Sequence, residues 1–244
     1  MINVLGQEYL SLDEYLDTKK FDSIVDEIII GIAKSKYAAG PTNTGSGYLD
    51  TAIPSTFEIH KTILKDSTHP YYSTIKQLKN WEPLVFIQYK WPSHTLGQCL
   101  VLRSPGIGLY ETKHDPDQCK DFPIISNFAP LMNWLASENI FQHIGRIIIF
   151  LNDPNSRVLE HRDYSDGISR KDQFIWISPL GSKKFYVRDD AKKVYFDSRF
   201  CYFDNANIHG ADPINHSTFS IRIDGTFSKN FLDKTNLSNH IYDT

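Results

Sequence analysis

The chain has 244 residues and a formal net charge of −3, from 26 basic and 29 acidic side chains. Hydrophobic residues make up 41% of it and aromatic residues 13%, which is enough apolar surface to bury a core within one domain. No block or stripe of basic residues is present, so the electrostatic footprint of nucleic-acid binding is missing. We therefore expect a globular protein that has no nucleic-acid partner.

Cysteine usage and the N-terminal residues both favour a reducing, aqueous compartment. The cysteines are odd in number and widely spaced, and they form neither a CxxC pair nor a zinc pattern: Cys99, Cys119 and Cys201. The first ten residues do not have the basic-then-apolar order of a secretory signal. The apolar run at 28–33 is too short to cross a bilayer. The sequence thus predicts a cytoplasmic protein with no membrane partner.

Residues 1–82 are predicted to be helical and to decorate the outside of a sheet. Ser11, with Glu14 three residues later, is typical of a helix start. Apolar residues then recur at threes and fours from Phe21, which predicts a second helix that ends near Lys36. A third helical stretch covers 57–81 and is broken near a proline.

A glycine-rich stretch at 40–47 separates the second and third of these helices. Its glycines have the spacing of a phosphate-binding loop, but the lysine that should follow the second glycine is missing. No apolar strand precedes it either. We therefore interpret it as a lid over the functional site, a common role of long loops.

From Leu84 onward the hydrophobic period changes from helical to strand-like. Short apolar runs separated by turn residues recur at intervals of about ten residues, which predicts a β-sandwich or barrel over 83–230. One helix, from Asn127 to Phe141, interrupts the series, and the polar tail at 231–244 is expected to be loosely held. The fold class is thus mainly β with N-terminal helices (α+β), in one domain that spans 1–244. The predicted strands are 84–89, 99–103, 144–151, 158–163, 173–178, 184–187, 193–196, 200–203 and 218–223.

Potential metal ligands lie in this β-rich part. His161 and Asp163 are two residues apart, so their side chains point to the same side of an extended strand. His209 follows later in the chain. Two imidazoles and one carboxylate can cover one face of an octahedral metal and leave the opposite face open, as in non-haem iron(II) oxygenases. Arg222, further on, offers a planar guanidinium that can pair with a carboxylate close to that metal.

Each of these residues also has a plainer interpretation. The triplet at 161–163 is compatible with a surface turn held by ion pairs, and His209 is compatible with a turn histidine. His216 competes with His209 as the second histidine ligand. It lies in the loop at 213–217, however, which leaves only six residues before Arg222, so we favour His209.

The order His161-x-Asp163, then His209, then Arg222 resembles the signature of the 2-oxoglutarate- and iron(II)-dependent dioxygenases. The resemblance covers about the last hundred residues and the β-rich run before them. It implies a double-stranded β-helix, or cupin-like jelly roll, in which the two histidines and the aspartate bind Fe(II). It further implies that Arg222, with Ser220 beside it, anchors the far carboxylate of 2-oxoglutarate, and that O2 is the oxidant.

The implied reaction is hydroxylation of an unactivated carbon, with succinate and CO2 as co-products. Asp163 stands where related halogenases have a small residue, so hydroxylation is favoured over halogenation. We expect a small-molecule substrate, a polar metabolite such as an amino acid or a natural-product precursor. The alternatives are a hydroxylase of a peptide or protein side chain, another cupin-type metalloenzyme, and a metal-free jelly-roll binding protein.

Candidates for contacting the substrate are Trp176, Arg103 and Arg146. Trp176 follows the metal loop on a predicted strand, where a core position is equally compatible. Arg103 and Arg146 lie in apolar strands, where an unpaired guanidinium would be costly. Each arginine is therefore expected to pair with a substrate carboxylate or with a neighbouring acid.

Overall fold

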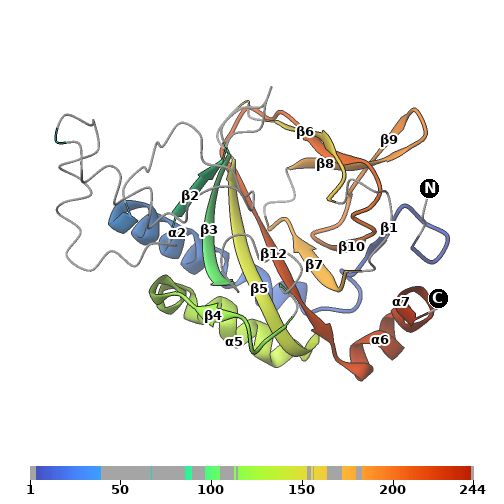
Figure 1. Ribbon diagram of the computed structural model, residues 1–244, viewed down its shortest axis with the longest axis horizontal. Helices are drawn as coiled ribbons and strands as arrows, with labels where there is room; N and C mark the ends of the chain where they lie inside the picture. Colours follow the sequence, from blue (N-terminus) through green and yellow to red (C-terminus); the bar gives the residue numbers. More distant parts are fainter. Residues whose placement is uncertain are drawn as a thin grey trace.

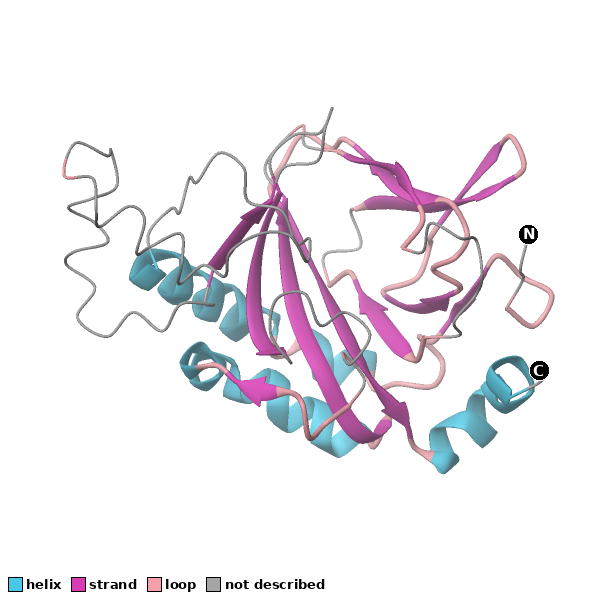
Figure 2. Ribbon diagram, in the orientation of Figure 1, coloured by secondary structure: helices cyan, strands magenta, loops and turns pink. Residues whose placement is uncertain are grey.

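Two antiparallel β-sheets with helices along one side form the architecture of the computed structural model (Figures 1 and 2). The structure describes residues 4–39, 67, 86–89, 97–104, 113, 115–152, 155, 157–163, 172–179 and 183–242. The predicted lid at 40–47 lies outside these residues, and so does the predicted helix at 57–81 except for residue 67, which is in a turn. No helix among the described residues is long and apolar enough to span a membrane.

The larger sheet contains eight strands. Its order is β1 (Tyr9–Ser11), β10 (Phe200–Phe203), β7 (Phe174–Ile177), β12 (Thr218–Phe227), β5 (Phe141–Asn152), β3 (Gly97–Ser104) and β2 (Phe86–Tyr89), with β4 (Lys120–Asp121) beside β3. The smaller sheet has the order β6 (Val158–His161), β11 (His209–Asp212), β8 (Lys184–Asp189) and β9 (Lys192–Tyr195).

From β5 to β12 the chain crosses from one sheet to the other after every strand except β8, which is paired with β9 in the smaller sheet. β5, β7, β10 and β12 lie in the larger sheet, and β6, β8, β9 and β11 lie in the smaller one. The first and last of these eight strands, β5 and β12, pair with each other along almost their whole length. Eight strands folded back and forth between two antiparallel sheets in this way form a jelly roll. The predicted jelly-roll core is therefore confirmed, with β11 as a strand that the sequence patterns did not predict.

β12 presents different residues to its two faces, because successive side chains in a strand alternate. Ile221 and Ile223 are fully buried in the main hydrophobic cluster, which also contains helix residues such as Phe21. Ser220 and Arg222, at the alternate positions, are also buried but contact residues in the space between the sheets. One strand thus supplies apolar side chains to the helix-side core and polar side chains to the inter-sheet space.

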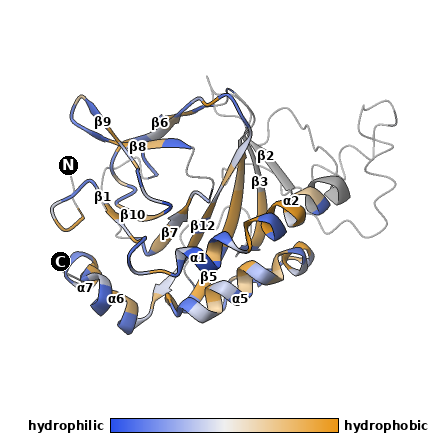
Figure 3. Ribbon diagram, turned by 180° about the vertical axis from the view of Figure 1, so that it is seen from behind, coloured by the Kyte–Doolittle hydropathy of each residue, from blue (hydrophilic) through white to orange (hydrophobic). Residues whose placement is uncertain are grey.

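Helices cover the face of the larger sheet that Figure 3 turns toward the viewer. They are α1 (Thr18–Asp22), α2 (Val25–Ala39), the short 3-10 helix η2 (Pro123–Phe128) and α5 (Ala129–Glu138). Phe21 of α1 packs edge-on against Trp134 of α5 and against Phe200 of β10, with ring centroids 4.8 and 5.0 Å apart. Helices are confirmed in both predicted regions and lie outside the sheet, but their bounds differ. The helix predicted from Phe21 is divided into α1 and α2, and the one predicted over 127–141 is α5, which ends before β5 begins at Phe141.

The predicted helix that starts at Ser11 is wrong. Ser11 ends β1 and pairs with Cys201 of β10, and the next amide, that of Leu12, donates to the carbonyl of Phe200 at 2.8 Å. Pairing with a sheet edge distant in sequence therefore overrides the local capping pattern. The helix begins later, at Thr18, where the Asp17 carboxylate accepts a hydrogen bond from the Lys20 amide.

The C-terminal residues are helical and packed, unlike the loosely held tail expected from their polarity. α6 (Lys229–Thr235) is capped by the Ser228 hydroxyl, which accepts from the Phe231 amide at 3.2 Å, and α7 (Leu237–Tyr242) follows. Phe231 and Leu237 are at most 3% exposed. A few apolar residues at helical spacing are enough to hold this segment on the core.

Gly31 is expected to be needed for the contact between α2 and η2. A Cβ at this position would lie 2.6 Å from the Asn127 carbonyl oxygen and 2.9 Å from the Phe128 ring. In Gly31→Ala, overpacking of about 1–3 kcal/mol should exceed the roughly 1 kcal/mol that alanine contributes to helix propensity. We expect a lower free energy of unfolding in urea. Ile30→Ala, at a position that is half exposed, is the control and should stay within about 0.5 kcal/mol. A Gly31→Ala variant as stable as the parent would contradict the contact.

Candidate metal centre

His161, Asp163 and His209 meet because β6 and β11 are neighbours in the smaller sheet. His161 is the last residue of β6 and lies directly opposite His209, the first residue of β11. Their ring centroids are 4.3 Å apart. Asp163 follows β6 by two residues, and its amide donates to the Asn205 carbonyl at 3.1 Å, which holds this turn against the segment before β11. The sheet register therefore brings together residues that are far apart in sequence.

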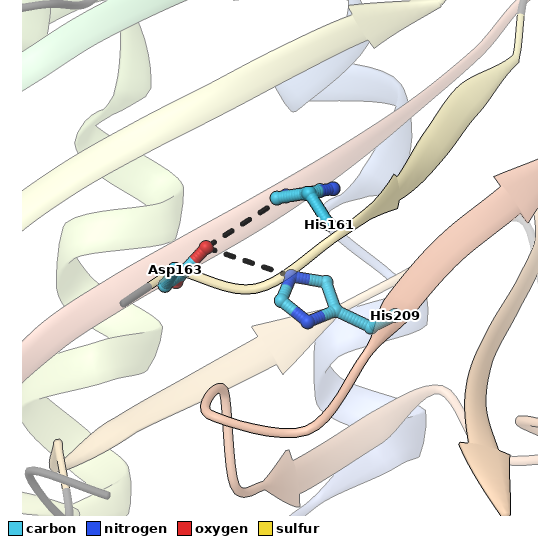
Figure 4. Close-up of side chains that lie close together, drawn as sticks. All are labelled: His161, Asp163 and His209. Carbon is cyan, nitrogen blue, oxygen red and sulfur yellow. Dashed lines mark ion pairs between the residues drawn. The ribbon is translucent and has the colours of Figure 1, made fainter. Parts of the chain in front are cut away.

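The three side chains point their ligand atoms at one another (Figure 4). Asp163 Oδ1 lies 3.7 Å from His161 Nε2 and 3.5 Å from His209 Nε2, and all three ligand atoms lie within 4.8 Å of one another. Two ligands of one metal that are at right angles to each other lie about 3 Å apart. Small side-chain rotations would therefore close this set around a single divalent ion.

Backbone carbonyls orient both imidazoles. His161 Nδ1 lies 2.8 Å from the carbonyl of Leu159, and His209 Nδ1 lies 2.9 Å from the carbonyl of Asn207. A proton on each Nδ1 satisfies these carbonyls and leaves the lone pair of Nε2 directed at the centre. Hydrogen bonds of this kind fix the tautomer and the ring orientation of histidine ligands.

The two oxygens of Asp163 have different surroundings. While Oδ1 faces the imidazoles, Oδ2 accepts hydrogen bonds from Arg222 Nη1 and Asn205 Nδ2, both at 2.8 Å. Burial alone would raise the pKa of this carboxyl, but the hydrogen bond with His209 and the charge of Arg222 hold the pKa well below its ordinary value. The carboxylate is therefore ionised and has one oxygen available to a metal.

Arg222 lies among several carboxylates. In addition to Asp163, its Nε donates to Asp224 Oδ1 at 2.9 Å, and its Nη2 lies 3.5 Å from Asp172 Oδ2. The guanidinium carbon lies 4.0 Å from the centre of the Phe174 ring. The guanidinium of Arg222 therefore contacts three carboxylates and one aromatic ring beside the candidate metal ligands.

Two more cations complete this buried network. Lys113 pairs with Asp172, and Arg146 Nη2 pairs with Asp224 at 2.9 Å. Burial, together with the nearby charge of Arg222, lowers the pKa of Lys113 to about 8. The positive side chains of Arg222, Lys113 and Arg146 thereby balance the carboxylates of Asp163, Asp172 and Asp224, which is how buried charges are normally tolerated.

Lys183 supplies a further buried cation in the inter-sheet space. It lies just before β8, and its Nζ donates to Ser220 Oγ at 3.2 Å. The amine is 5.0 Å from the centre of the Trp176 ring and 6.0 Å from that of Phe185. Desolvation lowers the pKa of Lys183 to about 7.

Some residues of the site were missed in the sequence, although a signal for Lys183 was present. Lys183, Phe185 and Val187 alternate with more polar residues, and in a strand this places all three on one face. Asn205 lies in a polar run before His209 that resembles an ordinary turn. Lys113 and Asp172 stand in polar segments that give no sign of burial.

The structure brings the predicted ligands together beside Arg222: His161, Asp163 and His209. The competing His216 is exposed and lies outside this group, where its Nδ1 contacts the side chain of the adjacent Asn215. Ser220 Oγ accepts a hydrogen bond from Lys183 Nζ at 3.2 Å.

The predicted substrate residues lie in or near the core. Trp176 is 7% exposed and packs between Phe150, on which it stacks, and Phe185, as expected of a core tryptophan. Arg103 Nη1 pairs with Asp121 at 2.6 Å, and Arg146 pairs with Asp224 as described above. The expected alternative of a neighbouring acid is therefore observed for both arginines.

No protein-family model matches the chain, and no curated protein matches its sequence. Solved structures that match it in shape include a prolyl hydroxylase from Trichoplax adhaerens in complex with a hypoxia inducible factor peptide fragment. That pair has 12% identity and a TM-score of 0.36, over 75% of this chain and 81% of that one. An oxidoreductase of the 2OG-Fe(II) oxygenase family from Burkholderia pseudomallei has 11% identity and a TM-score of 0.34, over 52% of this chain and 67% of that one.

The viral collagen prolyl hydroxylase of Paramecium Bursaria Chlorella virus-1 matches over 92% of each chain, with 8% identity and a TM-score of 0.32. At these identities and scores, the chemistry of the present chain follows only from its own side chains.

Proposed function

We propose that this protein is an iron(II)- and 2-oxoglutarate-dependent oxygenase that hydroxylates an unactivated carbon of a small polar metabolite. One observation carries the proposal: two imidazole nitrogens and one carboxylate oxygen converge within 4.8 Å of one another between the sheets of a jelly roll. This donor set suits a first-row divalent metal and leaves an open face for other ligands.

His161, Asp163 and His209 would hold the iron. Hydrogen bonds already orient both rings and the second oxygen of the carboxylate, so the donors are positioned before any metal arrives. With 2-oxoglutarate and O2 on its open face, the metal would supply oxidation of a C–H bond, coupled to release of succinate and CO2.

Aromatic side chains line the inner side of the centre. Phe203 and Phe185 lie 5.2 and 5.8 Å from the His209 ring, and Trp176 packs against Phe185 at 4.8 Å. These rings exclude water from one side of the site and so strengthen electrostatic interactions there. The far carboxylate of a bound 2-oxoglutarate would be buried and would need a cation. Arg222, as predicted from the sequence, and Lys183 are the described candidates.

The net charge of −3 without a basic stripe supports a small metabolite over a nucleic acid as the substrate. A peptide or protein side chain is the second candidate.

Anaerobic addition of Fe(II) and then 2-oxoglutarate to the purified protein tests the proposal. We expect a visible charge-transfer band that needs both components, followed by succinate release when air is admitted with a panel of metabolites. Metal binding without this band would favour another cupin-type metalloenzyme. A protein that retains no metal in equilibrium dialysis would instead be a binding protein, and the proposal would be wrong.

A further inference from the structure

We propose that Lys183 and Ser220 bind the remote carboxylate of the 2-oxo dicarboxylic acid, while Arg222 positions the metal ligand Asp163. This inference rests on the proposed function and assigns different roles to Lys183 and Arg222, two of the buried cations beside the candidate metal centre. It replaces the role that the sequence pattern gives to Arg222.

The hydrogen bonds of Arg222 identify it as a positioning residue. Its Nη1 holds Asp163 Oδ2 at 2.8 Å and its Nε holds Asp224 Oδ1 at 2.9 Å. Turning the guanidinium away from this position would break both hydrogen bonds to acids, of which Asp224 is fully buried. Leaving such acids unpaired is costly, so their geometry favours an Arg222 that stays in place when the co-substrate binds.

Lys183 has the surroundings of an anion anchor. Its side chain is 8% exposed, and its amine lies over the Trp176 ring and beside the Ser220 hydroxyl. An ammonium and a hydroxyl can each donate to one carboxylate, and a charged pair is the strongest form of such a contact. Desolvation lowers the pKa of Lys183 to about 7, so a bound carboxylate would stabilise an ammonium that burial disfavours.

The spacing along β12 fits a dicarboxylic acid. Ser220 and Arg222 are on the same face of the strand, and such residues lie about 7 Å apart along it. Along this face of β12, Arg222 lies next to Asp163 and the candidate metal centre, and Ser220 lies next to Lys183. If 2-oxoglutarate chelates the metal, its two methylene groups would extend from the metal centre toward Lys183 and Ser220. The aromatic rings of Trp176 and Phe185 flank that route.

Comparing 2-oxoglutarate with pyruvate isolates the remote carboxylate, because pyruvate has the same chelating end and lacks the rest. Binding of both acids to the Mn(II)-loaded full-length protein is measured by calorimetry. The parent protein should prefer 2-oxoglutarate. Lys183→Met should weaken 2-oxoglutarate binding by about 10- to 100-fold, the effect of a charged hydrogen bond, and leave pyruvate within about 3-fold. Ser220→Ala should give a smaller loss in the same direction.

Thermal unfolding without ligand distinguishes a lysine that binds the co-substrate from one that only stabilises the fold. Methionine has a similar length and no charge to desolvate, so Lys183→Met should be at least as stable as the parent at pH 7. If Lys183→Met does not fold, Ser220→Ala provides the readout. A preference for 2-oxoglutarate that survives both substitutions but is lost in Arg222→Lys would overturn the assignment. If neither acid binds the Mn(II)-loaded parent, the proposed function itself fails, which is a distinct result.

Discussion

Replacing His209 with alanine should abolish tight binding of Fe(II) or Mn(II), whereas His216→Ala should leave it unchanged. His209 is 4% exposed, and its Nε2 points at Asp163, while His216 is exposed in the loop before β12. Losing one of three protein ligands should weaken binding by on the order of 100-fold or more, since losing even an outer hydrogen bond typically costs 10- to 100-fold. Equilibrium dialysis with metal analysis measures the affinity directly.

The same experiment extends to the other two ligands. His161→Ala is the cleaner variant, because the side chain of His161 is 24% exposed and its removal leaves no buried charge behind. Asp163→Ala should lose metal as well, but it also removes the partner of Arg222 and should lower stability. Stoichiometric metal retained by both His161→Ala and His209→Ala would show that these side chains do not form a metal site.

Arg222→Met is expected to destabilise the protein by about 3–5 kcal/mol, the usual cost of removing one partner from a buried charge network. Three carboxylates within 3.5 Å of its guanidinium, those of Asp163, Asp172 and Asp224, would lose that partner. The matched control is Arg188→Met. The Arg188 ion pair with Glu160 is partly exposed, so its loss should cost about 0–1 kcal/mol. Equilibrium unfolding in urea compares the two variants, and equal effects would refute a special role for the buried network.

Arg222 is also expected to make the free energy of unfolding depend on pH, through its effect on the pKa of Asp163. Burial raises the pKa of Asp163, but hydrogen bonding with His209 and the charge of Arg222 outweigh it, so the folded-state pKa lies below the ordinary 3.8. A carboxyl with a lowered pKa contributes stability above its unfolded-state pKa and loses it as the pH falls through the folded-state value. A variant without the guanidinium should therefore unfold at a higher pH during acid titration of the metal-free protein. Arg222→Lys, which keeps the charge, should move the midpoint less.

The candidate metal ligands could be named from the sequence because the spacing of His161 and Asp163 is a local pattern. Their two-residue spacing predicts a common face in a strand that runs to Asp163. In the structure β6 ends at His161 and Asp163 lies in the turn after it, where its side chain still faces the imidazoles. The jelly roll could be predicted only through the resemblance, since short apolar runs indicate strands without giving their order. The predicted helix at Ser11 is wrong for a related reason. This segment forms a strand that pairs with β10, which lies far away in sequence.

The division of roles among the buried cations could not be predicted in this way. Arg222 and Lys183 are both basic residues near apolar strands, and which of them pairs with Asp163 depends on side-chain positions across two sheets. Asp172 and Asn205 show the same limit, because neither belongs to a regular strand. Their importance comes from burial beside the triad, which is a property of the assembled core.

β12 supplies isoleucines to one side and Ser220, Arg222 and Asp224 to the other, so its register affects both the hydrophobic core and the candidate metal centre. Inserting or deleting one residue within this strand would exchange the two sets, driving a guanidinium and a carboxylate into the layer beneath the helices. Length variation during evolution should thus be tolerated in the turn at 213–217, ahead of the strand, and purged beyond it. A misregistered chain could not persist as a stable protein that lacks only the candidate metal centre, because the same error would also disrupt the hydrophobic core.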